Sequence, residues 1–229
     1  MSKQTPTMRP NAVFLILTLV AALVASIGMA RAQTEILTFD DLPFTARFDQ
    51  IPNGYGGLQW DTFDALNTAL EFSQFGFDGY VNGVVSPNNV AFNAGGSPAF
   101  FSGQAFNLNS AYLGAAWNDG LQVEVQGFVG TILTYDNTYT VNTLGSTLIN
   151  FNYVGVNEVK FISSGGVPHG YPSGGAGTQL VMDNLSITLV PEPSTFALAG
   201  LAPIILPLWR LTRAKKLRTN SILMPALMN

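Results

Sequence analysis

The sequence predicts an all-β protein, an antiparallel β-sandwich of the jelly-roll type that spans residues 33–189. Three observations lead to this fold class. The run from Leu121 to Val129 alternates apolar and polar residues, which is the period of a strand with one buried face. Similar short β-branched and aromatic runs recur between turn residues, and 21 of the 23 glycines lie in this segment. No long amphipathic helical period interrupts the series.

The predicted strands follow one another at short intervals. The sequence WNDGLQ places Asn118, Asp119 and Gly120 between two of them, which is typical of a hairpin turn. A weak helical pattern, WDTFDALNTALEF at 60–72, is expected to form no more than a turn or two. The first and last strands of a jelly roll commonly lie side by side, so we expect the two ends of the domain to pair. The predicted strands are residues 34–39, 89–93, 110–117, 121–129, 131–136, 138–141, 146–154, 157–164 and 178–189.

The amino end, residues 1–32, has the features of a signal peptide. Lys3 and Arg9 precede the apolar run AVFLILTLVAALVASIGMA, and Ala30 and Ala32 form the small-x-small pattern that signal peptidase recognises. We therefore expect signal peptidase to release a mature chain that begins at Gln33. The alternative is an uncleaved membrane anchor, because the apolar run is long for a signal core.

The carboxyl end carries an apolar segment followed by a basic cluster. From Phe196 to Trp209 the residues are uncharged and mostly apolar, which is close to the shortest transmembrane helix, although Pro203 and Pro207 would kink it. Basic residues flank both apolar segments, a distribution that places the two basic ends in the cytoplasm. The alternative is a buried core helix. The basic cluster consists of Arg210, Arg213, Lys215, Lys216 and Arg218.

Together with the residues before it, this end resembles the PEP-CTERM sorting signal of Gram-negative bacteria, here residues 190–218. The resemblance implies recognition by an exosortase at the inner membrane, and a link to exopolysaccharide and biofilm production. The same element is also labelled an ice-binding protein carboxyl-terminal domain. The family usually ends soon after its basic cluster, so residues 219–229 are an extra tail. The motif residues are Pro191, Glu192, Pro193, Ser194 and Thr195.

The domain itself resembles the globular parts that precede PEP-CTERM signals, in the sequences TFDDLP, IPNGYGGLQW, GYVNGVVSPNNVAFN and MDNLSIT. It is more distantly similar to jelly-roll carbohydrate-binding modules of the galactose-binding type, whose last strand carries an Asp followed by alternating aliphatic residues. A fold shared with binding modules does not establish binding.

Charge and composition exclude several kinds of partner and site. All 14 acidic residues lie between Glu35 and Glu192, where only Arg47 and Lys160 are basic. Such an acidic surface repels phosphate backbones, so we expect no nucleic acid partner. The chain has no cysteine and a single histidine, which excludes disulfides and argues against thiolate, zinc and haem chemistry.

Acidic residues near the first and last strands suggest a structural calcium site. If these strands are neighbours, some of the carboxylates can converge on one Ca²⁺, a hard cation that prefers oxygen ligands. The alternative is that they cap turns and accept hydrogen bonds from local backbone amides. The candidate ligands are Glu35, Asp40, Asp41 and Asp183.

Aromatic residues beside glycine-rich loops are candidates for carbohydrate binding, because a sugar ring stacks its apolar face on an exposed aromatic ring. We single out Trp60, Trp117 and Tyr171, with a role in the core as the alternative. The loop at 163–178 holds His169 and is either functional or a flexible solvated segment.

No catalytic set stands out in the sequence, and we expect no enzyme. The sequence therefore predicts an exported cell-surface or matrix protein that is sorted by an exosortase. A calcium-supported carbohydrate-binding module, for example for exopolysaccharide, is the alternative. Ice binding is a third possibility, although no flat, regular threonine array is visible.

Overall fold

Strand β8 (Leu121–Val129) shows most clearly how the sequence pattern becomes a sheet. In the computed structural model, which describes residues 32–43 and 46–190, its residues Leu121, Val123 and Val125 are fully buried and the polar residues between them are half-buried. This confirms the predicted period of two. β8 turns into β9 (Ile132–Val141) through Gly130, whose φ of 61° is readily adopted by glycine.

Several of the sequence predictions fall outside the described residues. The signal peptide lies there up to residue 31, and so do the sorting motif, the apolar segment, the basic cluster and the tail. Within the part of the chain that the structure describes, no helix is long and apolar enough to cross a bilayer.

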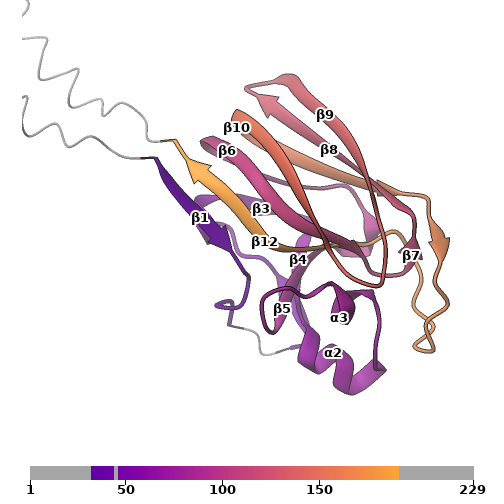
Figure 1. The fold of residues 1–229 in the computed structure, drawn as a ribbon. Helices are drawn as coiled ribbons and strands as arrows, with labels where there is room; N and C mark the ends of the chain where they lie inside the picture. Colours follow the sequence, from indigo (N-terminus) through magenta and orange to yellow (C-terminus); the bar gives the residue numbers. More distant parts are fainter. Residues whose placement is uncertain (1–31, 44–45, 191–229) are drawn as a thin grey trace, which may run out of the picture. The chain divides into compact units, whose positions relative to one another are not determined.

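The described residues form a mostly antiparallel β fold with a few short helices (Figure 1). One ten-stranded sheet has the order β2-β4-β5-β12-β6-β10-β8-β9, with β1 paired to β12 and β3 paired to β6, and β7 and β11 form a separate pair. The remaining strands are β1 (Gln33–Leu37), β2 (Phe48–Gln50), β3 (Gln59–Asp61), β4 (Phe63–Asn67), β5 (Asn89–Asn93), β6 (Ala99–Ala115), β7 (Asn118–Asp119), β10 (Thr147–Ser164), β11 (Val167–Pro168) and β12 (Leu180–Leu189). The helices are η1 (Tyr55–Gly57), α2 (Thr68–Phe75), α3 (Gly79–Gly83) and η2 (Ala94–Gly96).

The sheet folds over on itself, which makes it sandwich-like. β3 and β4 are separated only by Thr62, whose φ of 60° marks a bend, so that β3 pairs with the start of β6 while β4 pairs with β5. β5 in turn pairs with β12, and β12 pairs with the second half of β6, so the strands from β4 round to β3 are joined by hydrogen bonds and the bend at Thr62 connects the two ends of this path. The expected pairing of the first and last strands is confirmed, with Gln33 opposite Leu189.

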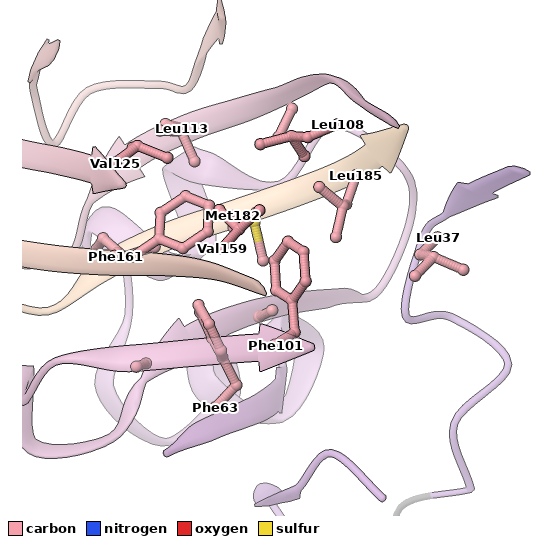
Figure 2. Close-up of a cluster of buried hydrophobic side chains, with 14 of the residues drawn as sticks. Leu37, Phe63, Phe101, Leu108, Leu113, Val125, Val159, Phe161, Met182 and Leu185 are labelled. Carbon is pink, nitrogen blue, oxygen red and sulfur yellow. The ribbon is translucent and has the colours of Figure 1, made fainter. Parts of the chain in front are cut away.

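One continuous apolar core fills the space between the two sides of the folded sheet. Figure 2 shows Phe63, Phe101, Val125 and Phe161 pointing into this core together with other apolar side chains. Full burial of a Phe, Leu, Val or Met side chain contributes roughly 1.5–3 kcal/mol. A chain without disulfides depends on such burial for its stability.

One local prediction differs from the structure. The sequence Asn118-Asp119-Gly120 does not turn a hairpin, because β10 lies between β6 and β8, and Asn118 and Asp119 instead pair with β11. The expectation that the run at 60–72 forms no more than a turn or two of helix is confirmed, because most of it is strand, in β3 and β4, and the helix α2 begins only at Thr68. Asn67 caps α2, its side chain accepting a hydrogen bond from the backbone N–H of Leu70.

Candidate functional site

The three aromatic residues predicted to bind sugar lie in two different places. Trp60 is in the core, with 3% of its surface exposed. Its ring lies edge-on to Phe63 and 5.0 Å from Phe101, and its Nε1 donates a hydrogen bond to the Tyr55 carbonyl. The prediction for Trp60 is therefore corrected: it occupies the inward-facing position of β3 and has no free face for a ligand.

Trp117 and Tyr171 lie together at the surface, their ring centroids 6.4 Å apart. Trp117 lies two residues after the end of β6, and its ring meets Tyr80 of α3 edge-on at 5.5 Å. The Tyr171 hydroxyl is fixed by two hydrogen bonds of 3.0 Å, one donated to the Thr143 carbonyl and one accepted from Asn82 Nδ2. Two of the three predicted residues thus share one region of the domain.

Trp117 lines a cleft of about 420 Å³. Its floor is aromatic, because successive ring centroids are 5.5 Å apart for Trp117 and Tyr80, 5.2 Å for Tyr80 and Phe92, and 6.0 Å for Phe92 and Phe48. Asp64 of β4 and Gln179 place polar groups on the walls. The full lining consists of Arg47, Phe48, Asp64, Leu66, Tyr80, Phe92, Ala94, Gly95, Trp117, Gly175, Ala176 and Gln179.

A buried charged cluster stands behind one wall of the cleft. Arg47 forms an ion pair with Glu71 of α2, whose side chain is only 1% exposed. Asp78 is fully buried beside them; its Oδ1 accepts a hydrogen bond from the backbone N–H of Val81, and its Oδ2 has no partner. Burial, with the Glu71 carboxyl adding to it, raises the pKa of Asp78 to about 7. Glu71 is paired with Arg47 and the Asp78 carboxyl lies beside Glu71, so one of these two carboxyl groups retains a proton near neutral pH.

The wall of the cleft that holds Asp64 carries less negative charge than its carboxyl group suggests. Partial burial raises the pKa of the Asp64 carboxyl, and the nearby charge of Asp49 adds to the shift. The charge of Arg47 is offset by Glu71. The cleft therefore combines aromatic surface and hydrogen-bonding groups with little net charge.

The loop at 163–178 is packed against Trp117. His169 donates its backbone N–H to the Trp117 carbonyl, and its Nδ1 lies 2.6 Å from Asp119 Oδ2. Hydrogen bonds from His169 and from Thr143 lower the pKa of Asp119 to about 2. Farther along the loop, a Cβ on Gly175 would come within 2.1 Å of the Trp117 ring, so glycine permits the close approach. The loop thus supplies part of the wall of the cleft.

The four predicted calcium ligands do not gather at one point. Asp183 is fully buried and accepts hydrogen bonds from the backbone N–H groups of Val85, Ser86 and Asn184 and from the Ser86 hydroxyl. Asp183 lies on β12 between the residues that pair with β5 and those that pair with β1. Its carboxylate accepts hydrogen bonds from backbone N–H groups of the segment that precedes β5.

The other three carboxylates lie near the first strand. Asp40 Oδ1 accepts a hydrogen bond from the Asn89 backbone N–H, Asp41 Oδ1 accepts one from the Tyr55 hydroxyl, and Glu35 is opposite Ile187 in the β1–β12 pair. Among residues 32–43 and 46–190, no three His, Asp or Glu side chains form a group that could hold a metal ion. The local hydrogen bonds of Asp40, Asp41 and Asp183 match the alternative reading of these residues.

Sequence reasoning missed most of the cleft. Arg47 precedes β2, Phe48 begins it, Tyr80 comes from α3 and Phe92 from β5. The pairing of β2 and β5 with β4 and the packing of α3 bring these distant segments together. The one local signal was the exceptional Arg47, which with Lys160 is one of two basic residues in the domain. A rare basic residue in an acidic domain suggests a specific partner, here Glu71.

Comparison with known proteins leaves the family of this chain open. No protein-family model matches the sequence, and no curated protein matches it. Among solved structures, the fold is similar to that of TmCBM61, described in complex with β-1,4-galactotriose, at 10% identity and a TM-score of 0.28. The match covers 59% of this chain and 93% of that chain. A likeness at this level carries no argument about function.

Proposed function

We propose that this chain is an exported cell-surface protein whose domain binds carbohydrate in the cleft beside Trp117. The observation that carries the proposal is the aromatic floor of that cleft, with polar groups of Asp64 and Gln179 on its walls. In this proposal the sandwich-like domain is a jelly roll of the kind found in binding modules. The domain acts by binding and not by catalysis.

The chemistry of the cleft suits a sugar better than an ionic ligand. A pyranose ring has an apolar face that packs on an aromatic ring and a rim of hydroxyl groups that bond to carboxylate and amide groups. The described residues carry 13 carboxylates against Arg47 and Lys160, a net charge of −11, which disfavours anionic ligands. An uncharged saccharide is not repelled by this negative charge.

Substitution of Trp117 by alanine tests the binding site. We expect the purified chain to bind neutral glycans on an array, and Trp117→Ala to weaken the binding at least about tenfold, the size of effect typical of a central aromatic contact. Trp117→Phe retains an aromatic face and should lose less. Thermal unfolding of both variants checks that they remain folded. Binding that is equal in all three proteins would place the carbohydrate site elsewhere, and the absence of any glycan binding would overturn the proposed function.

Delivery to the cell surface is a separate part of the proposal. It is supported by the resemblance of residues 190–218 to a PEP-CTERM signal and by the signal peptide pattern before Gln33. In a host that has the cognate exosortase, we expect mass spectrometry of the released protein to find a terminus close to Pro191-Glu192-Pro193. A released protein that still extends to Asn229 in such a host contradicts exosortase processing and leaves the carbohydrate site untouched.

A further inference from the structure

The aromatic floor of the cleft continues past its rim onto α2. The guanidinium carbon of Arg47 lies 4.9 Å from the ring centroid of Phe48, inside the cleft, and 4.9 Å from that of Phe75, at the end of α2. The rings of Phe48 and Phe75 both belong to side chains that are more than two fifths exposed. Arg47 therefore links an aromatic ring of the cleft to an aromatic ring outside it.

The helix α2 exposes all of its apolar residues, and the two residues that it buries are polar. Thr68 and Glu71 are buried, whereas Leu70, Phe72 and Phe75 are exposed. Phe77, which follows the helix and is 64% exposed, packs on Phe72 with a centroid distance of 4.8 Å. This is the reverse of the usual pattern of a surface helix. A cluster of exposed aromatic side chains of this kind marks an interaction surface.

The charges around this surface limit what can occupy it. Arg47 is paired with Glu71, and the described domain has a net charge of −11, so an acidic polymer or an anionic membrane is repelled. The surface is also continuous with the cleft through Arg47 and Phe48. An uncharged chain of sugar rings matches both features, because its rings can follow successive aromatic side chains without a compensating charge.

We propose that an uncharged polysaccharide chain runs from the cleft, across Arg47, onto Phe75 and Phe72 of α2. The ligand is then a polymer, and α2 provides a second contact region. This inference rests on the proposed function and specifies its ligand class. It predicts that affinity increases with the length of the saccharide, since a disaccharide fits within the cleft and a longer chain reaches α2.

Calorimetry on the full chain tests this, with disaccharides and hexasaccharides of galactose, glucose, mannose and xylose as probes. We expect the preferred hexasaccharide to bind about tenfold or more tightly than its disaccharide, and Phe75→Ala and Phe72→Ala each to lower that ratio severalfold. Ile132→Ala is the matched control, because Ile132 is 69% exposed on the β8–β9 hairpin, and it should leave the ratio unchanged.

The outcomes separate this inference from the proposed function. Equal binding of disaccharide and hexasaccharide overturns the extended surface and leaves the cleft as the carbohydrate site. A length preference that both phenylalanine variants retain places the second contact away from α2. No binding of any probe counts against the proposed function itself. Two other results would overturn the proposal. If the protein self-associates in sedimentation and the phenylalanine variants do not, a second copy covers α2. If the protein floats with phosphatidylcholine vesicles and the variants do not, a lipid surface covers α2.

Discussion

Replacing Asp183 by alanine is expected to lower the free energy of unfolding by about 3–5 kcal/mol, whether or not calcium is present. The substitution removes the acceptor for the backbone N–H groups of Val85 and Ser86 and for the Ser86 hydroxyl. These groups lie in the segment between α3 and β5, which would lose its attachment to β12. Urea unfolding followed by tryptophan fluorescence, in millimolar Ca²⁺ and in EDTA, measures the effect.

The matched control is Asp136→Ala, because Asp136 is an exposed carboxylate of β9. This variant should change the stability by less than about 0.5 kcal/mol. One result would contradict the structural role of Asp183 without calcium. If EDTA destabilises the unsubstituted protein and has no effect on Asp183→Ala, then Asp183 is a calcium ligand, as its place in the last strand first suggested.

Substitution of Asp78 by asparagine should stabilise the protein at pH 8 by about 2–4 kcal/mol and have much less effect at pH 5. The pKa of Asp78 is about 7 in the folded protein, above the usual aspartate value, so the folded state retains a proton that the unfolded chain releases. The stability that this proton provides is complete below about pH 4 and is lost as the pH rises to about 7. Asparagine keeps the acceptor for Val81 N–H and replaces the proton with an amide donor.

The groups around Asp78 come from three segments: Glu71 from α2, Arg47 from the approach to β2, and Tyr80 from α3. Since the variant retains all three, the difference between the two proteins at each pH isolates Asp78. Melting temperatures from pH 5 to pH 8 should fall more steeply for the unsubstituted protein. Asp61→Asn, an exposed carboxylate in β3, is the control. Parallel curves for the unsubstituted protein and Asp78→Asn would show that Asp78 titrates normally.

The sequence predicted strands well where a single face is buried. β8 matches the predicted run at 121–129 and β5 matches that at 89–93, because alternation and turn residues are local signals. The predicted runs at 146–154 and 157–164 are one strand, β10, whose bulges near Asn152 interrupt the alternation without ending the pairing. The pattern at 60–72 fits either a helix or an alternating strand, and sheet pairing decides between them.

The candidate site was less accessible from the sequence. Trp60 and Trp117 both stand near glycines, and only the inward position of Trp60 on β3 places it in the core. The partners of Asp183 lie 97 and 98 residues before it in the chain, so no local pattern indicates them. The pairing of Arg47 with Glu71 likewise depends on the packing of α2 beside β4.

The antiparallel pairing of β1 with β12 determines how the domain responds to a pulling force. Gln33 lies opposite Leu189, so the chain enters and leaves the domain at the same end of this strand pair. Tension applied between the two ends breaks the hydrogen bonds of the pair one after another, as in a zipper, instead of shearing them all at once. Leu37 is the only fully buried residue of β1, at its inner end, so the first pairs can separate before the core is reached. A domain tethered through one end alone carries no such load across this pair.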